Sequence, residues 1–172
     1  LIAGANDSME WDYWYASALR YSDLEAAASI GKQAAERTIR RMNPRSIDTG
    51  NYPVLFSAET ARSLIGHFLG AVSGGALYRR ASFLLDSVDT KLFPDWFSLL
   101  ERPHIPRGFR SANFDAEGVA TREQHLVQNG VLKHYLLGSY SARKLGMESS
   151  ANAGGVHNLD TTANAGDLNG ML

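Results

Sequence analysis

The chain has 172 residues, of which 44% are hydrophobic and 20% are charged, a composition typical of one globular domain or of two joined pieces of domains. Its formal net charge of −1, without any block of basic residues, argues against a nucleic-acid-binding surface. There is no cysteine, and no apolar run approaches the roughly 18 residues of a membrane span. We therefore expect a cytoplasmic protein that contacts neither nucleic acid nor a membrane directly.

The first residues predict a short sheet. The run DSMEWDYWY, within residues 1–15, is rich in aromatic side chains, which favour strands and hairpin edges. We expect Trp11, Tyr13 and Trp14 to be buried on a sheet face, because large rings stabilise a sheet by packing. An aromatic cage for a ligand is the alternative interpretation of the same run.

A helix is predicted over residues 23–42. Ser22 and Glu25 form a capping-box pattern, and the apolar residues that follow recur at helical spacing. The Asn-Pro pair that ends in Pro44 terminates the pattern. Polar residues with Gly and Pro then favour a linker.

These elements suggest two parts of different character. We assign residues 1–44 to the end of an N-terminal α/β region, residues 45–52 to a linker and residues 53–172 to an incomplete C-terminal segment. The predicted fold class is α+β: helices with antiparallel sheet, spanning the end of one domain and the start of a β-rich one.

A second helix is predicted over residues 58–73. Ser57 is a plausible N-cap, and the apolar residues after it form one stripe at helical spacing. We expect Leu64, Ile65 and Phe68 of this stripe to be buried.

Residues 123–137 predict a β-hairpin. Two apolar runs flank Asn129-Gly130, which is the strongest sequence signal for a two-residue type I′ turn. That register sets His125 opposite His134, near enough to share a metal ion. Two ligands do not complete a metal site, so we take ordinary sheet residues as the default and leave metal binding open.

The sequence FDAEGV predicts an acidic turn. Asp115 and Glu117 stand beside Gly118, a context in which carboxylates accept hydrogen bonds from backbone N–H groups. A catalytic pair of carboxylates is the alternative.

The segment ETARSLIGH resembles the zinc motif His-Glu-x-x-x-His of the TldD/PmbA metallopeptidase family. Arg62 stands where the first histidine belongs and Ser63 where the glutamate belongs, so that only His67 remains. A guanidinium is always protonated and cannot bind zinc. The motif lies within the first of three blocks that resemble the family between residues 53 and 159: PVLFSAETARSLIGHFLGAVSGGALYRRASFLLDS, FDAEGVATREQHLVQNGVLKHYLLGSYSARKLGM and NAGGVHNL. The likeness is to an internal segment of its PmbA (TldE) branch.

The resemblance implies a non-metal subunit of a cytosolic TldD/TldE-type peptidase complex, not catalytic alone. The partner would be a TldD-like homologue that carries the zinc, and this chain would bind no metal or cofactor of its own; alone, it could form a homodimer. The family acts on unfolded peptides in antitoxin degradation and peptide-antibiotic maturation. The alternative is a self-sufficient hydrolase that depends on metal, through His67 or the pair His125 and His134, or on a dyad of Ser63 and His67.

Two blocks are the best candidates for a substrate-binding surface. The block SYSARKLGM supplies basic residues that could hold the carboxylate of a peptide terminus, and NAGGVHN supplies glycines that allow close approach of a backbone. The alternative is a basic helix end and a glycine loop without a ligand. The candidate residues are Arg143, Lys144, Gly154, Gly155, His157 and Asn158.

Overall fold

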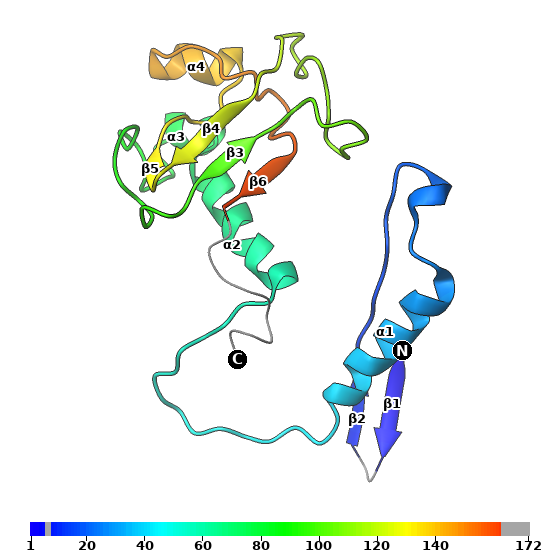
Figure 1. Ribbon diagram of the computed structural model, residues 1–172. Coiled ribbons are helices and arrows are strands. Elements are labelled where there is room, and N and C mark those ends of the chain that lie inside the picture. Colours follow the sequence, from blue (N-terminus) through cyan, green and yellow to red (C-terminus); the bar gives the residue numbers. More distant parts are fainter. Residues whose placement is uncertain (6–7, 163–172) are drawn as a thin grey trace. The chain divides into compact units, whose positions relative to one another are not determined.

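The computed structural model describes residues 1–5 and 8–162 (Figure 1). The chain divides into two compact units, Leu1–Pro53 and Val54–Leu172. Both combine helices with antiparallel strands, which confirms the predicted α+β class. Within the described ranges, no helix is long and apolar enough to cross a membrane.

The first unit is a hairpin packed against one helix. Strands β1 (Ile2–Ala5) and β2 (Ser8–Trp11) pair antiparallel, and helix α1 (Ala27–Arg40) contacts both. Thr38 of α1 is fully buried, and its hydroxyl donates to the Ala34 carbonyl at 2.8 Å. The pairing of β1 with β2 forms the hairpin that the aromatic run predicted.

The aromatic residues of this hairpin are less buried than the sequence predicted. Trp11 is 64% exposed and Tyr13 is 57% exposed, so the expected burial was wrong for both. Trp14 is partly buried, because its indole lies under the Arg37 guanidinium of α1. Side chains alternate between the two faces of an extended chain, and α1 covers only the face to which Trp14 belongs.

Helix α1 begins at Ala27, four residues later than predicted, after a short 3₁₀ turn at Tyr21–Asp23. The expected capping box does not form. The Glu25 carboxylate instead accepts hydrogen bonds from Ser29 and from Gln33, the latter at 2.9 Å. A capping box requires the glutamate side chain to turn back to the backbone N–H of the capping residue. Here Ser29 and Gln33 hold the Glu25 carboxylate instead.

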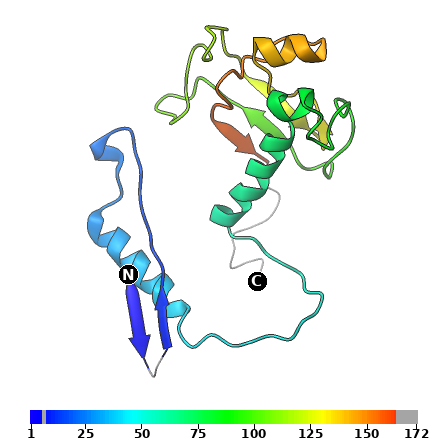
Figure 2. The same cartoon turned by 180° about the vertical axis from the view of Figure 1, so that it is seen from behind.

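Up to residue 162, the second unit is a four-stranded antiparallel sheet with three helices. The sheet order is β5-β4-β3-β6. Helices α2 and α3 lie on one face of it, behind the sheet in Figure 1 and in front of it in Figure 2. The elements are α2 (Ala58–Ala71), α3 (Gly74–Tyr78), β3 (Leu99–Glu101), β4 (Gln124–Gln128), β5 (Val131–Leu132), α4 (Ser139–Leu145) and β6 (Leu159–Thr161).

Helix α2 confirms the predicted helix, ending two residues early, but its burial was only partly anticipated. Ile65 and Phe68 pack, partly buried, against the core. Leu64 is 49% exposed, so its predicted burial was wrong. The buried stripe of α2 is narrower than its apolar stripe, because only one edge of the helix faces the sheet. Fully buried side chains of the core include Val72, Leu77, Leu99, Leu126 and Leu132.

The predicted hairpin is confirmed. Asn129 and Gly130 have φ values of 50° and 79°, as a type I′ turn requires, and Gln128 pairs with Val131. A Cβ on Gly130 would collide with the Phe93 carbonyl, so this position requires glycine for space as well as for φ.

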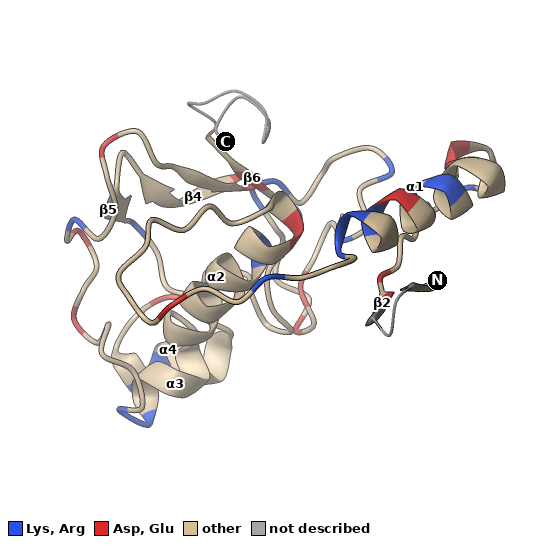
Figure 3. Cartoon of the chain, turned by 90° about the horizontal axis from the view of Figure 1, so that it is seen from below, with Lys and Arg blue, Asp and Glu red and all other residues tan. Residues whose placement is uncertain are grey.

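Charged residues are distributed without segregation by sign. Figure 3 shows Lys and Arg interspersed with Asp and Glu over the described parts of both units. Several of them form exposed ion pairs, such as Lys133 with Asp89 at 2.7 Å. Such pairs stabilise weakly and leave no broad field of one sign on the described residues.

Candidate functional site

The zinc-motif positions lie on the exposed side of α2. Arg62, Ser63 and His67 are all exposed. The Ser63 hydroxyl donates to the Thr60 carbonyl of the same helix at 2.7 Å, which directs its proton away from His67. A cation, a hydroxyl and one imidazole do not fit a zinc site, and a nucleophile–base pair is not assembled.

The histidine pair of the hairpin is not assembled into a site either. Strand β5 ends at Leu132, and His125 pairs with Leu100 of β3. Burial, followed by the positive charge of Arg122, lowers the pKa of His134. In residues 1–5 and 8–162, no group of three or more His, Cys, Asp or Glu side chains is placed to hold a metal.

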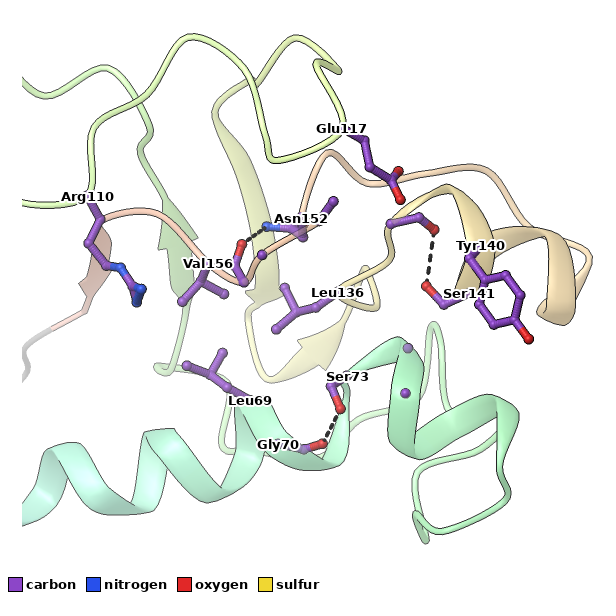
Figure 4. Close-up of a pocket in the computed structure, with 16 residues that line it drawn as sticks. Leu69, Gly70, Ser73, Arg110, Glu117, Leu136, Tyr140, Ser141, Asn152 and Val156 are labelled. Carbon is purple, nitrogen blue, oxygen red and sulfur yellow. Dashed lines mark hydrogen bonds between the residues drawn. The ribbon is translucent and has the colours of Figure 1, made fainter.

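A pocket of about 550 Å³ lies in the second unit, where the C-terminal end of α2, the starts of α3 and α4, and the loop after Ser150 meet. Leu69, Leu136 and Val156 form its apolar part, and Figure 4 shows them between Arg110 on one side and Glu117 on the other. Six glycines complete much of the lining: Gly70 of α2, Gly74 and Gly75 of α3, Gly138 before α4, and Gly154 and Gly155 of the loop. Such a surface can accept an apolar side chain and the backbone that carries it.

Only part of the predicted substrate surface borders this pocket. Gly154 and Gly155 line it, with φ values of 89° and 113°. Arg143 and Lys144 are exposed in the last turn of α4 and are not among the lining residues. The Lys144 ammonium lies 5.7 Å from the ring centroid of Tyr140, which does line the pocket.

His157 and Asn158 anchor the glycine loop. His157 is 9% exposed, and its backbone N–H donates to Glu101 at 2.8 Å. The Asn158 amide donates to the Arg102 carbonyl and to Ser111, and its oxygen accepts the Arg110 N–H at 3.0 Å. Both side chains are committed to the protein itself, so they shape the site rather than offer free groups to a ligand.

Glu101 is the centre of a buried polar network that sequence reasoning missed. It is 1% exposed, at the end of β3. Its carboxylate accepts hydrogen bonds from Gln124 at 2.8 Å, from the Asn152 amide at 2.8 Å, and from the backbone and ring of His157. Asn152 lines the pocket, so the network ties the pocket wall to the sheet. The sequence signal that could have revealed Glu101 is its position, since it is an acidic residue at the end of an apolar run.

The acidic turn has the structural role predicted for it. Asp115 accepts hydrogen bonds from the N–H groups of Glu117, Val119 and Ala153 at 2.9–3.0 Å. Burial acts to raise the pKa of Asp115, but these three backbone donors outweigh it and hold the pKa below the ordinary value. Glu117 in turn accepts the Ser139 N–H at 2.7 Å, at the start of α4.

Comparison with known proteins gives the family. Residues 49–172 match the PmbA/TldA metallopeptidase C-terminal domain. The chain belongs to the TldD/PmbA metallopeptidase family. It is 44% identical over 158 residues to the metalloprotease PmbA of Escherichia coli O157:H7, covering 92% of this chain and 35% of that protein. It is 42% identical over 173 residues to a PmbA homologue of Haemophilus influenzae, covering 100% of this chain and 38% of that protein.

Solved structures agree with this membership. A Bacteroides thetaiotaomicron protein, named as a candidate modulator of DNA gyrase, matches with a TM-score of 0.89 and 28% identity, covering 98% of this chain and 38% of that one. TldE of Thermococcus kodakarensis matches with a TM-score of 0.50 and 29% identity, covering 58% of this chain and 25% of that one. The chain thus spans little more than a third of the curated PmbA relatives, and the likeness to the PmbA (TldE) branch predicted from the motif is confirmed.

Proposed function

We propose that this segment belongs to the non-metal subunit of a TldD/TldE-type peptidase complex that acts on unfolded peptides in the cytosol. The observation that carries the proposal is the pair Arg62 and Ser63 on α2. These residues occupy the positions of the first histidine and the glutamate of the zinc motif. A metallopeptidase requires both a water-activating metal and a base, and neither residue can supply its part.

The pocket supports a role in holding substrate. Its apolar part is formed by side chains, and much of the rest is glycine backbone. Such a lining does not require one particular side chain in the ligand, so it suits extended peptides of varied sequence. The sheet also ends in the edge strand β6, and an edge strand can accept a peptide by strand addition. The outer edge of β5 is already hydrogen-bonded to residues 89–91.

The proposal assigns the chemistry to a partner. A TldD-like homologue would carry the zinc and the glutamate, and the present subunit would help to enclose the peptide. The similarity of the chain both to proteins named metalloprotease PmbA and to a TldE supports its membership of a TldD/TldE-type family. Antitoxins and peptide-antibiotic precursors, which contain unfolded segments, are the substrate classes we propose for the complex.

The test is peptide cleavage by the full-length protein, by its metal-bearing homologue and by their mixture, each with and without a chelator. We expect no cleavage by this protein alone and chelator-sensitive cleavage of unstructured peptides by the mixture. Cleavage by this protein alone that resists the chelator would overturn the proposal in favour of a Ser-dependent hydrolase. A matched control is His67→Ala, which should leave cleavage by the mixture unchanged if α2 binds no metal.

A further inference from the structure

The pocket has one basic side chain within the described residues, Arg110. No ion pair to another described residue engages its guanidinium, and the side chain is exposed. The neighbouring Arg102 differs, because it is paired with Asp160 at 2.8 Å and with Glu123 at 3.2 Å. Arg102 is therefore already neutralised, whereas Arg110 presents its positive charge to whatever enters the pocket.

The backbone of Arg110 is fixed in place by the glycine-loop block. Its N–H donates to Asn158 at 3.0 Å, and the Asn158 amide donates to Ser111 at 2.8 Å. A Cβ on Gly108 would lie 2.7 Å from the Asn158 side chain, so the chain can approach this closely only at a glycine. The backbone of Arg110 is thus preorganised, so a ligand that binds its guanidinium does not have to order this loop.

The opposite side of the pocket carries the opposite charge. Glu117 lies across from Arg110 in Figure 4, with Leu69, Leu136 and Val156 between them. A carboxylate entering the pocket is repelled by Glu117 and attracted by Arg110, so the charges give a bound peptide a direction. The volume of about 550 Å³ is enough for a short stretch of chain, but not for a folded segment.

We propose that this pocket binds the C-terminal end of an extended peptide, with the terminal carboxylate on Arg110 and the last side chains on the apolar part. A guanidinium binds a carboxylate through two parallel N–H···O hydrogen bonds, which is the geometry a chain terminus offers. The inference rests on the proposed function, because it takes the ligand to be a peptide. It also moves the carboxylate-binding role from Arg143 and Lys144, on the exposed end of α4, to Arg110.

The test is peptide binding to the full-length protein in complex with its metal-bearing homologue, with chelator present so that nothing is cleaved. Three labelled peptides of one sequence without other acidic residues are compared: a C-terminal acid, a C-terminal amide, and an amide that carries one glutamate as its last residue. Fluorescence anisotropy gives each Kd for the wild type, Arg110→Gln and the matched control Arg143→Gln. Because both arginine side chains are exposed, neither change disturbs the core, and circular dichroism checks the fold.

We expect the acid to bind roughly fivefold more tightly than the amide in the wild type and in Arg143→Gln, and equally in Arg110→Gln, as for one partly exposed ion pair. Equal binding of acid and amide by the wild type, or a preference that survives Arg110→Gln, would overturn the inference and leave the proposed function intact. Arg110-dependent binding of the glutamate-bearing amide as tight as that of the acid would support a carboxylate subsite with a side chain as its source. Failure of every peptide to bind would overturn both proposals.

Discussion

Replacing Glu101 by Gln should destabilise the second unit through its buried polar network. The new side chain has the same size but exchanges one acceptor oxygen for an NH₂ group. In the wild type, Oε1 of Glu101 accepts three hydrogen bonds, from Asn152 and from the backbone and ring of His157. Its Oε2 accepts one hydrogen bond, from Gln124. In either orientation of the amide, at least one of the four hydrogen bonds becomes a contact between two donors.

The magnitude follows from the burial of these groups. A buried donor that loses its acceptor costs about 1–3 kcal/mol. Gln124 retains the Ser150 carbonyl as a second acceptor at 3.0 Å, which limits the loss. We therefore expect Glu101→Gln to lower the free energy of unfolding by about 2 kcal/mol, a large part of the roughly 5–15 kcal/mol of a typical domain.

The assay is urea unfolding of the full-length variants, followed by circular dichroism, with hydrogen exchange of residues 152–158 as a local readout. Glu123→Gln is the matched control, because Glu123 makes a surface ion pair with Arg102 and its side chain is 59% exposed. The control should change stability by less than about 0.5 kcal/mol. If Glu101→Gln shifted the urea midpoint no more than the control and left exchange of the loop unchanged, the stabilising role of the network would be refuted.

Three further outcomes are expected. The stabilisation from Asp115 is present above its ordinary pKa of 3.8 and is lost as the pH falls through its lower native value. The stability difference between the wild type and Asp115→Asn, measured by urea unfolding, should therefore narrow between about pH 5 and pH 2; a constant difference would contradict this. Gly130→Ala should lower the free energy of unfolding by about 3 kcal/mol or more, because it combines positive φ with a collision, whereas Gly118→Ala, with φ of 81° and open space, should cost about 1–2 kcal/mol; equal costs, measured by urea unfolding, would refute the collision. Arg62→His combined with Ser63→Glu would restore the two histidines and the glutamate base of the motif but add no third ligand, so we expect less than stoichiometric zinc by elemental analysis; one zinc per chain would show otherwise.

Local signals in the sequence predicted local structure well. The turn at Asn129-Gly130 and the register of its strands follow from two adjacent residues with positive φ. Helix α2 follows from an apolar stripe at helical spacing, and it begins at the predicted residue, Ala58. These features depend on residues within a few positions of one another, so the pattern contains the information that fixes them.

Burial and helix capping depended on distant residues and were predicted less well. Leu64 belongs to the apolar stripe of α2 but lies to one side of the contact with the sheet. Glu25 has the spacing of a capping residue, but Trp14, eleven positions earlier, donates its indole N–H to the carboxylate at 3.0 Å. A local pattern does not show which competing partner the tertiary fold brings near.

The sequence predicted the candidate site only where glycines form its lining. Gly154 and Gly155 are adjacent glycines, and a loop lined by them was an accessible inference. Arg110 and Glu101 become part of the site only through contacts with residues 152–158, more than forty positions away. The only sequence signal for Glu101 is its place as an acidic residue at the end of an apolar run, and nothing in the composition around Arg110 distinguishes it from an ordinary surface position.

The order of strands in the second unit has a consequence for synthesis of the chain. Strand β3 lies between β4 and β6, and both of its neighbours follow it in the sequence: Leu99 pairs with Val127 on one side and with Thr161 on the other. A nascent chain therefore exposes β3 with both edges unpaired until β4 emerges, and with one edge unpaired until β6 emerges. Closing so long a loop slows folding, and an apolar strand left unpaired in the meantime can associate with other chains. The interval between the emergence of β3 and of β6 is the period in which a ribosome-bound chaperone would protect this protein most.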